Sequence, residues 1–130
     1  MGTVKVLPDT CAWIDFFNAR PTSLSTTLEG ELRRGTICTC GVVKYELVRG
    51  VKSKEEEQIL FRALQAVEHL EMTESLWIMA GELSAHLRRQ GITIPLSDIL
   101  IAVLALEHGL TILTVDRHFS LIEGLRVMAG

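Results

Sequence analysis

Four acidic residues stand where the ends of predicted elements can bring their carboxylates together: Asp9, Glu46, Asp98 and Asp116. Asp9 and Asp116 each follow a short apolar run that is typical of a buried strand. Glu46 lies in a short helical segment, and Asp98 lies in the first turn of an apolar helix. Each acid alone is also explained as a helix cap, a turn residue or a solvated charge. Convergence of the four, rather than any single position, would therefore indicate a functional site.

The chemistry of such a site follows from its charge. Carboxylates that converge repel one another unless protons or cations join them. Oxygen ligands of this kind suit Mg²⁺ or Mn²⁺, and such ions lower the pKa of a water molecule and stabilise charge on a phosphoryl group. Because no lysine is placed to neutralise all four acids, this acidic quartet predicts a divalent-cation site suited to hydrolysing a phosphodiester.

The elements that must position the quartet alternate between strands and helices. Strands are predicted over 4–7, 36–40, 69–72, 110–115 and 125–127. Helices are predicted over 11–18, 26–34, 42–49, 53–67, 74–90 and 95–108, with a helical turn near Phe119. This alternation predicts an α/β fold in which helices cover both faces of a parallel sheet. Sites in such sheets lie beyond the carboxyl ends of the strands, where the strand order switches, so Asp9 and Asp116 are expected at one edge.

Helix-end signals set several of these boundaries. Pro21 and Thr22 are expected to break the helix over 11–18, and Ser25 to open the next helix. Ser53 and Glu56 have the spacing of a capping box. Gly109 is expected to end the apolar helix that contains Asp98.

Composition indicates a single domain over 1–130, with 48% hydrophobic and 22% charged residues. No apolar run reaches the about 18 residues that a membrane span needs. Residues 1–10 predict a strand and a turn rather than a signal peptide. These features favour a cytoplasmic protein without a membrane partner. The three cysteines, Cys11, Cys38 and Cys40, show no obvious pairing, and small buried thiols are favoured over a zinc site.

The formal net charge of −3, from 13 basic and 16 acidic residues, does not exclude a nucleic acid substrate. If the four acids of the quartet bind cations, twelve acids remain against thirteen bases. The overall balance argues only against tight, nonspecific binding of a duplex, which needs a broad basic footprint.

Two other phosphate chemistries fit the sequence less well. Phosphotransferases of the haloacid dehalogenase type need a second Asp two residues after the first, and Cys11 stands there. Receiver domains need a phosphoacceptor Asp after a central strand and a Lys after the penultimate one, and neither is evident.

Four motifs together resemble the PIN-domain ribonucleases, and among them the VapC toxins of type II toxin–antitoxin pairs. They are D-T-C-A-W-I-D at 9–15, Y-E-L at 45–47, D-I-L-I-A at 98–102 and T-V-D-R-H-F at 114–119. The resemblance covers essentially the whole chain in the right order. It implies a three-layer α/β/α domain with a mainly parallel central sheet flanked by helices. It also implies an endoribonuclease that uses Mg²⁺ or Mn²⁺ and leaves 5′-phosphate and 3′-hydroxyl ends.

The resemblance assigns roles to individual residues. Asp9 and Asp98 would be the main metal ligands, with Asp116 and Glu46 in direct or water-mediated support. Thr10 and Thr114 match hydroxyl positions beside the first and last acids, where they would orient carboxylates or water. Each hydroxyl also has a purely structural explanation: Thr10 could be a helix cap, and Thr114 could be an ordinary strand residue. Cys11 stands where the family often has a small residue such as Ser.

The resemblance also implies partners. The substrate would be RNA, with transfer RNA and ribosomal RNA both plausible. A cognate antitoxin would wrap the toxin and block its site, homodimers are expected, and promoter DNA would be contacted only through the antitoxin. A hydrophobic groove near the predicted helices of 11–18 and 42–67 is a candidate binding site for a partner helix.

Basic and aromatic residues near the quartet have weaker assignments. RNA phosphates could contact Lys44, Arg49, Arg88, Arg89, Arg117 and His118, although a solvated surface charge explains each of them as well. Arg88 and Arg89 also suit a helix C-terminus. Trp13, Phe16 and Phe17 could stack on bases, but core packing is the favoured interpretation.

The sequence leaves two other functional classes open. One is a PIN-like scaffold that binds RNA or protein without cutting it. The other is a metal-dependent phosphatase acting on small substrates. The intact acidic quartet favours the ribonuclease.

Overall fold

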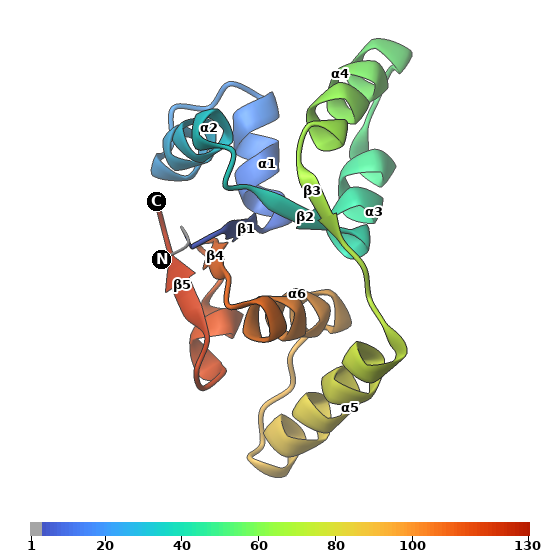
Figure 1. Ribbon diagram of the computed structural model, residues 1–130, viewed down its shortest axis with the longest axis vertical. Helices are drawn as coiled ribbons and strands as arrows, with labels where there is room; N and C mark the ends of the chain where they lie inside the picture. Colours follow the sequence, from blue (N-terminus) through green and yellow to red (C-terminus); the bar gives the residue numbers. More distant parts are fainter. Residues whose placement is uncertain (1–3) are drawn as a thin grey trace.

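The computed structural model describes residues 4–130 and confirms the alternation of strands and helices (Figure 1). Residues 1–3, which belong to the predicted strand and turn at the start of the chain, lie outside the described residues. The strands are β1 (Val6–Pro8), β2 (Cys38–Cys40), β3 (Glu68–Leu70), β4 (Thr111–Leu113) and β5 (Arg126–Met128). The helices are α1 (Thr10–Phe17), α2 (Ser23–Arg34), α3 (Gly41–Gly50), α4 (Lys54–Gln65), α5 (Glu74–Arg89), α6 (Leu96–His108) and the 3₁₀ helix η1 (Arg117–Leu121).

All strand pairs of the described chain are parallel, as predicted. One sheet has the order β1-β4-β5, and a second consists of β2 and β3. A single parallel bridge between Val6 and Ile37 joins them, and the Val6 N–H donates to the Thr36 carbonyl at 2.9 Å. The combined order is therefore β3-β2-β1-β4-β5. Chain order reverses between β1 and β4, and in α/β sheets the site lies at such a switch.

Helices lie on both sides of the strands, which gives the predicted three layers. Figure 1 shows α1 and α2 on one side of β1 and β4, and α6 with α5 on the other. The α6 helix is buried along most of its length, from Asp98 to Ala105. An apolar helix packed on the sheet in this way fixes the position of its own first turn, which contains Asp98.

The α2 helix begins three residues earlier than predicted. Thr22, which was predicted with Pro21 to break the preceding helix, is the N-cap of α2, because its hydroxyl accepts from the Ser25 N–H at 3.2 Å. The Ser25 hydroxyl in turn accepts from the Thr22 N–H at 3.2 Å. Two short hydroxyl side chains thus form the reciprocal cap that usually needs Glu or Gln at the second position.

The predicted capping box at the start of α4 is only half formed. Ser53 caps the helix by accepting from the Glu56 N–H at 3.1 Å. The Glu56 carboxylate, however, accepts from the N–H of Lys52 at 2.9 Å instead of that of Ser53. At the end of α6, Gly109 has a φ of 64° and closes the helix as predicted.

The core confirms the interpretation of the aromatic cluster and of the thiols. Trp13 is fully buried and stacks on Phe17 with ring centroids 5.7 Å apart, so its ring cannot stack on a base. Cys38 and Cys40 are buried, Cys11 is half-buried, and all three are free. The described residues share one apolar core. None of the helices in this part of the chain has the length and apolarity needed to cross a membrane.

Candidate metal centre

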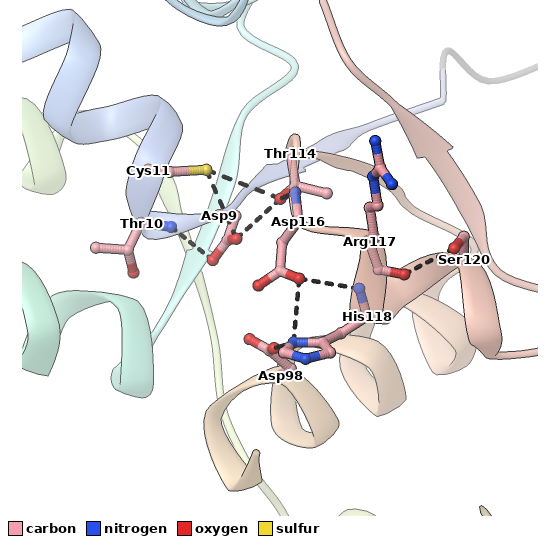
Figure 2. A network of polar contacts seen from close by, with 9 residues as sticks. All are labelled: Asp9, Thr10, Cys11, Asp98, Thr114, Asp116, Arg117, His118 and Ser120. Carbon is pink, nitrogen blue, oxygen red and sulfur yellow. Dashed lines mark hydrogen bonds and ion pairs between the residues drawn. The ribbon is translucent and has the colours of Figure 1, made fainter. Parts of the chain in front are cut away.

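Asp9 and Asp116 meet because β1 and β4 are adjacent parallel strands that end at the same edge. The Asp9 N–H donates to the Leu113 carbonyl at 2.9 Å, which extends the ladder by one residue. The Thr114 hydroxyl then donates to Asp9 Oδ2 at 2.9 Å and accepts from the Asp116 N–H at 2.9 Å. Thr114 is therefore the link between the first and last acids (Figure 2).

Asp9 is both a helix cap and a member of the acidic centre. Its Oδ1 accepts from the Thr10 N–H at 2.8 Å, which caps α1. Its Oδ2 faces Thr114 and, more weakly, the Cys11 thiol at 3.7 Å. Burial raises the pKa of Asp9, the two hydrogen bonds from Thr114 and Thr10 oppose that rise, and the charge of Asp116 adds to it. Asp9 is 8% exposed, so its charge is poorly solvated.

Asp98 is not a helix cap. The N-cap of α6 is Pro95, and Asp98 lies inside the first turn, 7% exposed, with Oδ2 facing His118. Burial raises the pKa of Asp98 to about 6, and repulsion from Asp116 and Asp9 adds to this rise, which the hydrogen bond with His118 opposes. An ordinary helix cap would stabilise its own charge, whereas this carboxylate is in an environment that disfavours it.

His118 contacts both Asp98 and Asp116. Its Nδ1 lies 3.0 Å from Asp98 Oδ2 and 3.0 Å from Asp116 Oδ1. Its backbone N–H donates to Asp116 Oδ1 at 2.9 Å, which caps η1. The hydrogen bond with Asp98 and the negative charge of Asp116 raise the pKa of His118. Ligand atoms of Asp98, Asp116 and His118 all lie within 4.8 Å of one another.

The His118 ring faces the two carboxylates, and its contact with an RNA phosphate stays a prediction. Its contact with Asp98 and Asp116 was not predicted from the sequence. The available signal was the D-x-H spacing at 116–118, because one turn of 3₁₀ helix brings such a side chain back beside the Asp at its cap.

Glu46 lies beside the three aspartates rather than among them. From α3 its Oε1 accepts from the Thr10 hydroxyl at 2.7 Å. Thr10 thus contacts two acids, Asp9 through its N–H and Glu46 through its hydroxyl. The geometry makes Glu46 an outlying member of the quartet.

The donor set of this centre fits Mg²⁺ or Mn²⁺. Within residues 4–130, no lysine or arginine forms an ion pair with any of the four acids, and the only basic partner is His118. Three aspartates, two of them buried, therefore face one imidazole and an excess of negative charge. Carboxylate oxygens are the ligands that these two ions prefer. A bound cation would offset the burial and the charge repulsion that raise the pKa of Asp98.

Within residues 4–130, none of the lysines and arginines predicted to contact RNA phosphates forms an ion pair with an acid of this centre. Arg49 stacks on the exposed Tyr45 ring, 5.1 Å from its centroid. Arg117 extends away from the carboxylates in Figure 2. Arg88 and Arg89 are exposed in the last turn of α5. With Lys44 on α3, their contacts with RNA stay predictions.

The predicted groove near 11–18 and 42–67 is present between α1, α3 and α4. It has a volume of about 300 Å³. Its lining comprises Ile14, Phe17, Asn18, Glu46, Leu47, Gly50, Val51, Lys52, Glu56, Ile59 and Leu60. Ile14 and Ile59 are 41% and 56% exposed although they are apolar. Because Glu46 lines the groove and also bonds to Thr10, the groove adjoins the acidic centre.

Comparison with known proteins identifies the family to which this sequence is similar. Residues 6–125 match the PIN domain. Ribonuclease VapC21 of Mycobacterium tuberculosis is 26% identical over 102 residues, which span 75% of this chain and 73% of that protein.

Two of the solved structures with a similar fold are chains of VapBC or toxin–antitoxin complexes. A chain of VapBC2 from Rickettsia felis, crystallised with a DNA fragment from their promoter, is 28% identical. Its TM-score is 0.80, and the match covers 96% of this chain and 98% of that one. A chain of a toxin–antitoxin complex from Klebsiella pneumoniae is 25% identical, with a TM-score of 0.75 and coverage of 96% and 97%.

Proposed function

The chain belongs to the PIN-domain family, and from that premise we propose that it is a metal-dependent endoribonuclease, the toxin of a type II toxin–antitoxin pair. The observation that supports this most is the convergence of Asp9, Asp98 and Asp116 from three elements onto one poorly solvated centre. The name of its relative VapC21, a ribonuclease, supports RNA as the substrate class.

In this proposal the four acids have unequal roles. Asp9 and Asp98 are the main ligands of Mg²⁺ or Mn²⁺, and Asp116 and Glu46 support them directly or through water. When bound, the ion lowers the pKa of a water molecule and offsets charge on the phosphoryl group. Hydrolysis then leaves 5′-phosphate and 3′-hydroxyl ends.

The residues around the acids position them. The Thr114 hydroxyl donates to Asp9 Oδ2 and accepts from the Asp116 N–H, and these two hydrogen bonds hold Asp9 and Asp116 at a fixed separation. Thr10 does the same for Asp9 and Glu46. Hydroxyl and N–H donors at 2.7–2.9 Å keep carboxylates oriented before any ligand arrives, which is how surrounding residues tune a metal site.

Cleavage assays test the proposal directly. Purified wild-type protein should cleave transfer RNA or ribosomal RNA fragments with Mg²⁺ or Mn²⁺ and stop with EDTA. Asp9→Asn and Asp98→Asn should lose that activity, whereas Glu82→Gln, which removes an exposed carboxylate of α5, should retain it. Sequencing of the 5′-phosphate ends would identify the cleaved RNA. Cleavage that persists in both Asn variants and resists EDTA would refute the proposal.

The same assay separates the ribonuclease from the other two classes. A small-substrate phosphatase would turn over a simple phosphomonoester such as p-nitrophenyl phosphate, which we expect the wild type to leave intact. A scaffold would bind RNA without producing new ends.

We further propose that the groove between α1, α3 and α4 receives an apolar segment of the antitoxin. A segment seated there would lie beside Glu46, and from there it would obstruct the acidic centre. Ile59→Glu should weaken inhibition by the product of the neighbouring gene without lowering cleavage. Val127→Glu, on the exposed face of β5, is the matched control and should be inhibited normally. Equal inhibition of both variants would exclude this groove.

Homodimer formation is also part of the proposal. Tyr45 and Trp77 are 61% and 50% exposed and line a second cleft between α3, β3 and α5, which gives a second copy an apolar surface to cover. Contacts with promoter DNA would come through the antitoxin. Native mass spectrometry of the chain alone should show the dimer, and Trp77→Glu should shift it to monomer.

A further inference from the structure

His118 is the one residue of the centre that brings nitrogen to a set of oxygens, and its placement is fixed from two directions. Its backbone N–H is bonded to Asp116, and the neighbouring Phe119 is fully buried and anchors η1 in the core. The ring is therefore positioned by the fold, although its side chain is 43% exposed.

The distances around Nδ1 resemble those of ligands around a metal ion. Nδ1 lies 3.0 Å from an oxygen of Asp98 and 3.0 Å from an oxygen of Asp116. In an octahedral shell with bonds of about 2.1 Å, ligand atoms at right angles lie about 3.0 Å apart. Both nitrogen–oxygen separations thus match those of neighbouring ligands, and the ligand atoms of the three residues all lie within 4.8 Å of one another.

A hydrogen bond alone satisfies this arrangement poorly. Nδ1 can present one N–H, which can point well at only one of the two oxygens. A cation among the three atoms would satisfy both carboxylates and the nitrogen together. The partly exposed ring also leaves space on its outer side for water.

We propose that His118 binds the catalytic ion through Nδ1 and gives the centre a preference for Mn²⁺ over Mg²⁺. This inference rests on the proposed metal centre and adds to it a ligand outside the acidic quartet. Imidazole is a ligand of transition metals, whereas Mg²⁺ prefers oxygen. A centre made only of carboxylates would distinguish the two ions less.

Two measurements on the full chain test the inference. Pulsed electron paramagnetic resonance of bound Mn²⁺ should show nitrogen coupling in the wild type, and His118→Ala should lack it. By calorimetric titration, His118→Ala should bind Mn²⁺ about tenfold more weakly and Mg²⁺ within about twofold of the wild type. His118→Gln, which introduces an amide oxygen in place of the imidazole nitrogen, should bind Mg²⁺ at least as well as the alanine variant, still without nitrogen coupling.

Controls tie the signal to this residue and this site. His86→Ala removes an exposed imidazole of α5 and should keep the nitrogen coupling. Asp98→Asn should abolish tight Mn²⁺ binding. Mn²⁺ bound at the Asp98 site without nitrogen coupling would overturn the role of His118 and leave the metal centre intact. Failure of the wild type to bind either ion would overturn both.

Discussion

The two sides of the acidic centre are built differently. On the sheet side, Asp9 receives hydrogen bonds from the Thr10 N–H and the Thr114 hydroxyl at 2.8 and 2.9 Å. On the helix side, the ring of His118 is the only side-chain partner of the Asp98 carboxylate among residues 4–130, and burial raises the pKa of Asp98 to about 6. The Asp9 carboxylate is held by two donors, whereas the Asp98 carboxylate has one, His118, whose hydrogen bond does not offset the effect of burial.

The difference shows how one site can be both ordered and ready to bind a cation. Donors on the sheet side reduce the cost of keeping Asp9 charged, although burial still raises its pKa. On the helix side, burial and the neighbouring acids disfavour the charge of Asp98, and a bound metal ion would stabilise it. We therefore expect the two sides to respond differently to substitution, and the predictions below run from the largest effect to the smallest.

Metal affinity should fall most, and on both sides. Asp9→Asn and Asp98→Asn each remove a proposed ligand, so each should weaken Mn²⁺ binding by more than the about 10- to 100-fold typical of losing a residue that merely orients a ligand. Calorimetric titration measures this, with Glu82→Gln as the control. Retention of full affinity by one variant would restrict the ion to the other side.

Loss of the sheet-side hydroxyl should have an intermediate effect. Thr114→Val removes a buried group that donates to Asp9 and accepts from Asp116, so we expect cleavage to fall about tenfold and the free energy of unfolding to fall by about 1–3 kcal/mol. Thr39→Val is the matched control, because the hydroxyl of Thr39 is buried without a hydrogen-bond partner among the described residues. That variant should be neutral or more stable. A similar loss in both would mean that Thr114 has no special part in the centre.

Without metal, the two Asn variants should differ in stability. Asp98→Asn removes a disfavoured charge, whereas Asp9→Asn also replaces an acceptor of two hydrogen bonds by a group with only one acceptor oxygen. Asp98→Asn should therefore be the more stable of the two by about 1 kcal/mol. Urea unfolding in EDTA measures this difference, and the reverse order would contradict the comparison.

The smallest effect concerns pH. The folded-state pKa of Asp98 is raised from 3.8 to about 6, so its contribution to stability is present below pH 3.8 and lost as pH rises through about 6. The stability advantage of Asp98→Asn over the wild type should grow across this window and then level off. The pKa of His118 is raised as well, so its own contribution is lost only above 6.5. An advantage that stays constant from pH 4 to 7 would show that Asp98 titrates normally.

The sequence predicted the parts of the site that depend on strand ends. Asp9 and Asp116 were expected at one edge because parallel strands end together, and the Asp9–Leu113 hydrogen bond places them there. Asp98 was expected in the first turn of a buried helix, which is where it lies. These positions follow from the alternation of strands with helices and from the spacing of apolar residues, both of which can be identified in the local sequence.

The parts that depend on side-chain direction were not predictable in the same way. His118 turns toward Asp98, 20 residues earlier in the chain, because η1 is a 3₁₀ helix capped by Asp116. The Glu46 carboxylate accepts from the Thr10 hydroxyl, a contact that the position of Glu46 in a short helix did not predict. The early start of α2 depends on a reciprocal bond between Thr22 and Ser25, a pair that standard capping patterns do not include.

The most direct test of a divalent-cation centre is a crystal structure of the full chain grown with Mn²⁺ and examined by anomalous scattering. We expect one strong peak among the carboxylates of Asp9, Asp98 and Asp116, adjoining the ring of His118. The peak should be absent in Asp98→Asn crystals grown in the same way. A wild-type map with no peak at these aspartates, while Mn²⁺ supports RNA cleavage in solution, would contradict the central claim.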